Sequence, residues 1–300
     1  MTFISAILAL TTLAACGPSV AEAERRDSGT GDAEGVTREI VNQPKSAQPT
    51  SPPTSQPAPS DPAVALLDRL ETAAEDLRDF SADITYFLWD SMLQRREIRG
   101  GEILYDVRPN DGSRRFAILV TSVTVGNRRD NQKKRYIFDG SWFVEIDYDN
   151  HMFTKRQIVA PGERFDPLKL GEGPFPLPVG QRRDDVLARF EASLLDGTRD
   201  KVLAKFLADK SVQGLKLVPR PSTPQADQVA DIEIFYDTAT LLPLGLVLTE
   251  INGNRKTVML RNLKRNQGID ESKLSIEQPD PKDWQIDVRP WVARRTRNDG

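Results

Sequence analysis

The 300-residue sequence contains one cysteine and one histidine, Cys16 and His151. A single cysteine has no partner for an intramolecular disulfide, and one Cys with one His cannot build a Cys/His zinc site. A Cys–His or Ser–His catalytic dyad would have to use His151, which follows Asp149-Asn150 in a predicted hairpin turn. An intramolecular disulfide and a Cys/His zinc site are therefore excluded, and the residues before His151 indicate that it lies in a loop.

Excess charge of either sign is also lacking over most of the chain. Residues 17–62 hold four basic and seven acidic residues, and the following residues hold 37 of each, with none in residues 1–16. A neutral folded part argues against a nucleic-acid partner, whose binding depends on the release of counterions by Lys and Arg. Short basic runs such as 133–135 and 294–295 are predicted to be solvated.

Proline is abundant in one segment and sparse elsewhere. Seven of the 21 prolines lie in the 19 residues of PKSAQPTSPPTSQPAPSDP (44–62), which contain no aromatic and no β-branched aliphatic residue. Too little apolar surface is present to offset the entropy of ordering, so residues 16–61 are predicted to form a disordered, semi-extended linker. A rigid proline-rich ligand for a recognition module is the alternative.

The N-terminus has the pattern of a signal peptide. Residues 3–15, FISAILALTTLAA, form an apolar run that is too short for a membrane-spanning helix and suits a signal core. Leu13-Ala14-Ala15-Cys16 resembles the lipobox of bacterial lipoproteins, which implies cleavage after residue 15 and lipidation of Cys16. The n-region departs from the usual pattern in having no Lys or Arg. An ordinary secretory signal with an incidental cysteine is the alternative.

Helix and strand signals follow the linker. Asp61-Pro62 is an N-cap followed by proline at the first helical position, and apolar residues then recur at helical spacing to Leu77. From Phe80 the period becomes that of strands, and Asp139-Gly140 and Asn252-Gly253-Asn254 are hairpin turn signals. The predicted strands are 82–89, 97–107, 115–125, 135–138, 142–148, 152–159, 215–218, 231–236, 244–251, 255–262 and 274–277.

Two helices are predicted in the middle of the chain. They cover 184–195 and 199–208, with Gly197 between them as a C-terminal cap, after a loop rich in Gly and Pro at 171–180. The expected fold is α+β: one antiparallel sheet of about eleven strands with a helix before it and two helices in the middle. The expected domain covers residues 62–285, followed by a basic tail at 286–300.

Four segments in this order resemble the LolA family of outer-membrane lipoprotein carriers. They are FSAD (80–83) after the first helix, GGEILYDVRP (100–109), YIFDGSWFVEID (136–147) and the late strand TVMLRNL (257–263). The resemblance implies an unclosed antiparallel half-barrel whose apolar concave face is covered by helices. It also implies that the protein holds acyl chains of lipoproteins or lipids, without metal or cofactor, and is not an enzyme.

Alternating apolar positions on the strands suggest which residues would hold an acyl chain, since such a chain needs an apolar surface protected from water. The alternative is that these side chains simply fill a core. In the family, an arginine before the proline is associated with holding the helical lid closed, and it matches Arg108, although Asn110-Asp111-Gly112 lengthens the turn that follows. The candidate acyl-chain residues are Ile103, Tyr105, Phe116, Ile118, Trp142, Val144 and Ile146.

A lipid anchor changes the expected role. The carrier itself is soluble and shuttles, whereas a protein anchored through Cys16 stays at a membrane. We therefore expect a tethered periplasmic lipid- or lipoprotein-binding protein at the outer membrane, with the inner membrane as the alternative. The outer membrane is favoured only by Gly17, which follows Cys16 where an aspartate would favour retention in the inner membrane. An envelope-stress sensor or scaffold acting on a protein partner is the second hypothesis. A carboxylate hydrolase using Asp184-Asp185 is the third, although neighbouring carboxylates at a helix start are better explained by the helix dipole.

Overall fold

The structure is a computed structural model that describes residues 61–108, 112–163 and 180–292. The predicted signal peptide, Cys16, the linker and the loop at 171–179 lie outside the described residues. Among the described residues, no helix has the length and apolar character needed to cross a membrane.

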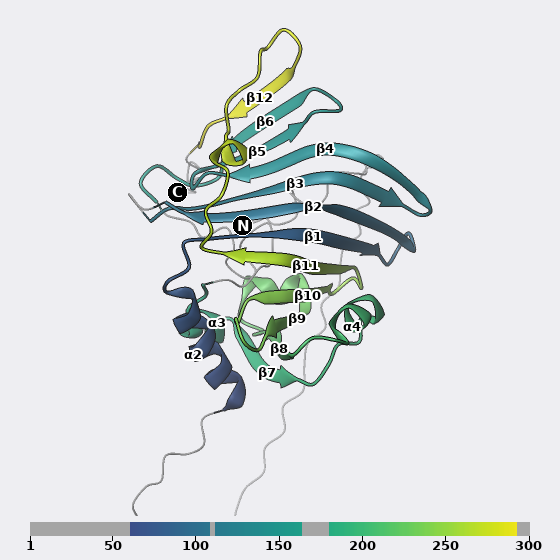
Figure 1. Ribbon diagram of the computed structural model, residues 1–300, viewed down its shortest axis with the longest axis vertical. Coiled ribbons are helices and arrows are strands. Elements are labelled where there is room, and N and C mark those ends of the chain that lie inside the picture. Colours follow the sequence, from purple (N-terminus) through teal and green to yellow (C-terminus); the bar gives the residue numbers. More distant parts are fainter. Residues whose placement is uncertain (1–60, 109–111, 164–179, 293–300) are drawn as a thin grey trace, which may run out of the picture.

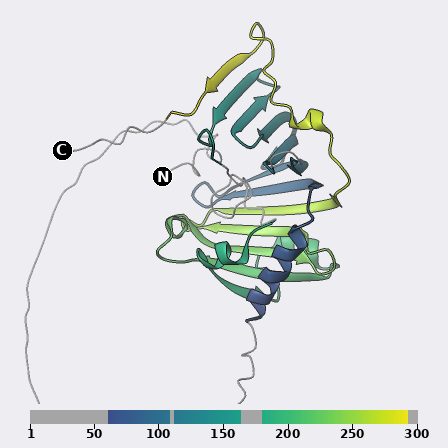
Figure 2. The same ribbon diagram turned by 90° about the vertical axis from the view of Figure 1, so that its left-hand side faces the viewer.

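One sheet of twelve strands forms the body of the protein, as Figure 1 shows. The sheet does not close, and its strands curve into the half-barrel that was predicted (Figure 2). Its spatial order is β12-β6-β5-β4-β3-β2-β1-β11-β10-β9-β8-β7, so that β12 and β7 are the two edges. The strands are β1 (Asp79–Asp90), β2 (Arg95–Val107), β3 (Arg114–Val125), β4 (Arg128–Phe138), β5 (Trp142–Asp147), β6 (Met152–Gln157), β7 (Phe190–Leu195), β8 (Val212–Pro219), β9 (Val229–Asp237), β10 (Pro243–Glu250), β11 (Arg255–Arg265) and β12 (Gln285–Arg289).

The helices are few and short. They are α2 (Pro62–Ala74), α3 (Arg183–Leu187) and α4 (Lys201–Leu207), with 3-10 turns η1 (Pro224–Asp227) and η2 (Glu271–Leu274). The start of α2 is as predicted, because the Asp61 side chain accepts a hydrogen bond from the Ala63 amide at 2.9 Å and Pro62 occupies the first turn. The Asp139-Gly140 and Asn252-Gly253 turns are also confirmed, with Gly140 and Gly253 at φ +105° and +84°.

The predicted helix 184–195 is wrong over most of its length. Only Arg183–Leu187 is helical, and Phe190–Leu195 forms the edge strand β7 against β8. Short apolar runs fit either period, and the hydrogen bonds offered by the free edge of β8 override the helical preference of this segment. Gly197 therefore follows a strand and caps no helix.

The C-terminal part also differs from the prediction. Residues 271–274 form η2 where a strand at 274–277 was expected, because Asp270 caps this turn through the Ser272 amide and Leu274 is buried. Residues 286–289, assigned to the tail, belong to β12, which pairs with β6 in parallel. The sheet is therefore mixed rather than purely antiparallel. A parallel pair needs a long connection, and residues 158–284 separate β6 from β12 in the chain.

Alternating side chains give the sheet two faces, each with its own cover. We call the inner face the one whose side chains share a core with Leu66 and Leu67 of α2 and Val186 of α3. The outer face has two cores, one under Leu203 and Leu207 of α4 and one under the segment 266–289, which we call the C-terminal segment. The expectation that both central helices cover the concave face is thus met by α3 and is wrong for α4.

Candidate functional site

Four of the seven candidate acyl-chain residues lie together on the inner face. Ile103 and Tyr105 of β2 pair with Ile118 and Phe116 of β3, and all four belong to the core that α2 shares. Phe80 of β1 stacks on Tyr105 with ring centroids 5.4 Å apart. None of the four is exposed to solvent, and their role in holding an acyl chain stays a prediction.

The other three candidates lie on the opposite face. Trp142, Val144 and Ile146 of β5 belong to the outer core under the C-terminal segment, so the seven side chains do not share one surface. The inner-face residue of this strand is Phe143, which pairs with Phe138 and was missed. The alternation of β5 was recognised correctly, but both of its faces are apolar at this end. Pairing with Phe138, which itself pairs with Phe116, decides which face is inside.

A small pocket with a cavity volume of about 30 Å3, partly open to solvent, lies on the inner face between α2 and the strands β8 and β9. Its wall on the α2 side is made by Leu67, Leu70, Ala74 and Leu77, and its lining is mainly apolar. The remaining residues around it are Ala73, Gly180, Gln181, Val186, Leu215, Leu217, Tyr236, Thr240, Leu241, Leu242, Pro243 and Arg265.

Arg265 holds the C-terminal end of α2 against the sheet. Its guanidinium donates a hydrogen bond to the Ala73 carbonyl at 2.6 Å and forms an ion pair with Asp76. The unpaired carbonyls at a helix end are natural acceptors for such a donor. This is the lid-holding chemistry that the resemblance suggested for Arg108, but a different arginine performs it.

Arg108 itself lies beyond the end of β2, where its amide bonds to the Ser113 carbonyl at 2.9 Å. Among the described residues, no hydrogen bond or ion pair joins its side chain to α2. Its charge instead adds to the effect of Arg115 in lowering the pKa of Glu271, on the outer face. The contact with a helix-terminal carbonyl that was expected of Arg108 is thus made by Arg265, and nothing in the local sequence around Arg265 predicts it.

Further polar contacts join α2 to its neighbours. The Asn266 side chain donates to the Asp76 carbonyl at 2.8 Å and accepts from the Arg78 amide at 2.8 Å. On the other side, the Glu71 carboxylate accepts the Arg183 amide at 2.8 Å, and the Arg183 guanidinium donates to Asp68 at 2.9 Å. These polar contacts lie at the surface and add to the burial of Ala63, Leu66 and Leu67 of α2 in the inner core.

The inner face becomes polar along β2, β4 and β5. Glu97 accepts a hydrogen bond from Nε of Arg99 at 2.5 Å, and Lys134 forms ion pairs with Glu145 at 2.5 Å and Asp147 at 3.4 Å. Burial alone would lower the pKa of Arg99, but the neighbouring Glu97 raises it above its ordinary value, so the guanidinium is charged.

Two tyrosines lie beside these charges. Tyr86 pairs with Arg99 across β1 and β2, and Lys134 lies over the Tyr136 ring at 5.6 Å from its centroid. Burial raises the pKa of both phenols, which therefore stay neutral hydrogen-bonding groups at any physiological pH.

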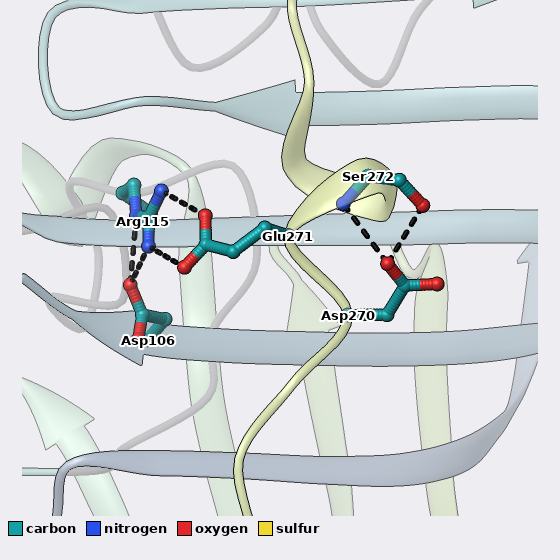
Figure 3. A network of polar contacts seen from close by, with 5 residues as sticks. All are labelled: Asp106, Arg115, Asp270, Glu271 and Ser272. Atoms are coloured by element: carbon teal, nitrogen blue, oxygen red, sulfur yellow. Dashed lines mark hydrogen bonds and ion pairs between the residues drawn. The ribbon is translucent and has the colours of Figure 1, made fainter.

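Ion pairs fasten the C-terminal segment to the outer face, as Figure 3 shows. Arg115 of β3 donates from Nε to Asp106 at 2.7 Å and from Nη1 to Glu271 at 2.9 Å. Lys273 donates to Glu102 at 2.6 Å. Trp284 packs edge-on against Tyr148 and His151 with centroids 5.6 and 5.4 Å away, which gives the single histidine a structural neighbour at its hairpin turn.

The described residues contain no group of three or more His, Cys, Asp and Glu side chains placed to hold a metal ion. Asp184 and Asp185 lie in the first turn of α3, which is the position expected from the helix-dipole interpretation.

Comparisons with known proteins find similar structures only. No protein-family model and no curated protein matches the sequence. A chain of the Pseudomonas aeruginosa MucA/MucB complex is 17% identical with a TM-score of 0.41, covering 71% of this chain and 60% of its own length. An uncharacterized conserved protein from Thermus thermophilus is 14% identical with a TM-score of 0.42, covering 76% of this chain and 100% of its own.

A LolA superfamily protein from Nitrosomonas europaea, NE2245, is also similar. It is 7% identical with a TM-score of 0.30, covering 71% of this chain and 97% of its own. These identities and TM-scores are low, and the chain spans only about three fifths of the MucA/MucB chain that it matches.

Proposed function

We propose that this protein is a membrane-tethered, periplasmic binding protein that holds an acyl chain of a lipid or lipoprotein on its inner face. The observation that carries the proposal is the small apolar pocket between α2 and strands β8 and β9, with Arg265 among its lining residues. An apolar concave site with a few polar groups at its rim is the usual form of a lipid-binding pocket. Anchoring through Cys16, at the outer membrane, belongs to the same proposal.

The test is native mass spectrometry of the full chain carrying Cys16→Ser, which should remove the proposed anchor. We expect the protein to retain an acyl-containing ligand, or to bind a fluorescent fatty acid when it is purified empty. Ala74→Trp should reduce this binding about tenfold or more, because the indole would fill the pocket. The matched control is Ala65→Trp, at an exposed position of the same helix.

Two results would contradict the proposal. One is an empty protein that binds no fatty acid, which would leave the sensor or scaffold hypothesis. The other is equal binding by the two tryptophan variants, which would place the acyl chain elsewhere. For the anchor, Cys16→Ser should move the protein from the membrane to the soluble fraction, and continued membrane fractionation would contradict lipidation.

A further inference from the structure

Three hairpin turns at one end of the sheet share a sequence pattern. They connect β1 to β2, β3 to β4 and β10 to β11, and Figure 1 shows them at the right-hand end of the strands. In each turn, apolar residues come first and arginine follows. The segments are SMLQRR (91–96), VGNRR (125–129) and INGNR (251–255), which together contain five arginines and no aspartate or glutamate. We call these three segments the turn surface.

Hydrogen bonds join the three turns to one another. The Ser91 hydroxyl donates to the Asn252 carbonyl at 2.7 Å, and the Ser91 amide donates to the Asn254 side chain at 2.9 Å. The Gly126 amide donates to the Arg96 carbonyl at 3.5 Å. The turn surface is therefore one continuous part of the molecule, although its segments are far apart in the sequence.

Large apolar side chains of the turn surface are held in solvent. Met92 is 90% exposed, Leu93 54% and Ile251 59%. The Asp90 carboxylate accepts hydrogen bonds from the amides of Met92 at 3.0 Å and Leu93 at 2.8 Å, so the turn that presents them is ordered. Single exposed apolar side chains are ordinary, but three on joined turns, where Gly, Asn, Asp and Ser are usual, indicate a partner that covers them.

The exposed charge around these side chains is mainly positive. Nearby carboxylates are set back from the surface, since Glu97, Glu250 and Asp200 have only 12%, 21% and 11% of their side chains exposed. Asp130 is 49% exposed and pairs with Arg128 at 3.0 Å. The arginines of the turn surface, all exposed, are Arg95, Arg96, Arg128, Arg129 and Arg255.

We infer that the turn surface docks on an anionic lipid bilayer. Met92, Leu93 and Ile251 enter the boundary between headgroups and acyl chains, while the arginines stay among the lipid phosphates. A stable protein interface covers about 800 Å2 on each partner around a broad apolar centre, whereas a few apolar side chains at turns beside arginines match the bilayer surface better. This inference goes beyond the acyl-binding proposal and does not depend on the pocket.

Vesicle sedimentation tests the inference with the full chain carrying Cys16→Ser, so that no lipid anchor contributes. Residues 1–15 carry no charged side chain and are the same in every variant, so they do not create a preference for anionic lipid. We expect binding to vesicles of phosphatidylglycerol and phosphatidylcholine in equal parts to be about tenfold or more tighter than to phosphatidylcholine alone. The double variant Arg95→Gln/Arg96→Gln should lower the affinity for the anionic vesicles about tenfold.

The apolar side chains are tested in the same assay. The double variant Met92→Ser/Leu93→Ser should lower the affinity for anionic vesicles about tenfold or more, because it removes the apolar surface that inserts. The matched control is Val288→Ser, which changes an apolar residue 43% exposed on the edge strand β12 and should bind as tightly as the parent protein.

Insertion can also be measured directly, because Cys16→Ser removes the one cysteine of the chain. A polarity-sensitive fluorophore on Met92→Cys should shift its emission to the blue on anionic vesicles, and the same fluorophore on Val288→Cys should not. Equal affinity for the two kinds of vesicle, unchanged binding by Met92→Ser/Leu93→Ser, or equal blue shifts at the two labelled positions would overturn the inference.

Complete failure to bind vesicles would also overturn the inference and would leave a protein as the partner of the turn surface. Ala74→Trp, which tests the acyl-binding pocket, should leave vesicle binding unchanged. The acyl-binding proposal and the docking of the turn surface can therefore fail separately.

Discussion

The two faces of the sheet are built from the same strands but are closed in different ways. On the outer face of β3–β6, the C-terminal segment of the same chain crosses the core and ends as a strand hydrogen-bonded to β6. On the inner face, α2 is 13 residues long and is held mainly by Arg265, Asn266 and contacts with α3. A helix of this length is marginal by itself, so its order depends on those contacts.

The two covers differ in how they are attached to the sheet. The C-terminal segment combines ladder hydrogen bonds, buried Leu274 and ion pairs through Arg115, and removing it would expose a complete core. The helix α2 buries Ala63, Leu66 and Leu67 in the inner core and also borders the small pocket. Because the outer core contains no residue of α2, loss of α2 would leave that core intact.

The largest expected effect comes from damage to the outer core. Phe153 of β6 is fully buried there, so Phe153→Ala should lower the free energy of unfolding by about 3–5 kcal/mol through lost burial and the cavity left behind. Urea denaturation measures it. Met152→Ala, next in the chain and more than one third exposed on the inner side, should change stability by no more than about 0.5 kcal/mol. Similar losses in both variants would mean that the outer core does not dominate stability.

A smaller and local effect is expected at the inner cover. Arg265→Ala removes the donor at the C-terminal end of α2, and a hydrogen bond from a charged group contributes about 1.5 kcal/mol, so amide exchange in α2 should accelerate roughly tenfold. Amides of β4 and β5 should keep their protection. Lys264→Ala, at the neighbouring exposed position, is the control. Equal acceleration in the strands would show that α2 does not open separately from the sheet.

The sequence predicted correctly those features that depend only on residues close together in the chain. The cap at Asp61-Pro62, the Gly140 and Gly253 turns and most strands needed only neighbouring residues, and the half-barrel followed from their order together with the family resemblance. The segment Phe190–Leu195 could not be assigned in this way, because it becomes a strand only by pairing with the edge of β8, which comes later in the chain. The apolar alternation of β5 likewise indicated two faces but could not say that Phe143 is inside, since the register with Phe138 decides this.

The lid-holding arginine shows the same limit for the site. The chemistry expected of Arg108, a guanidinium bound to helix-terminal carbonyls, is present in the structure at Arg265. Arg265 and its acceptor Ala73 are 192 residues apart, and only the end of β11 beside the end of α2 brings them together. The inward position of Arg99 beside Glu97 was not predicted either, because a charged residue on a strand is expected to face solvent until the register is known.

The smallest effect concerns the ion pair that fastens the outer cover. The hydrogen bond from Arg115 holds the pKa of Glu271 below its ordinary value of 4.5, so this contribution to stability is complete above pH 4.5 and is lost as the pH falls through the lowered value. Because Glu271 is largely exposed, Glu271→Gln should cost less than about 1 kcal/mol at pH 7. The difference from wild type should vanish in acid, as urea denaturation across pH 2–7 would show. Glu277→Gln, exposed in the same segment, should show no such pH dependence, and a difference for Glu271→Gln that persists at pH 2 would mean that the ion pair does not fasten the cover.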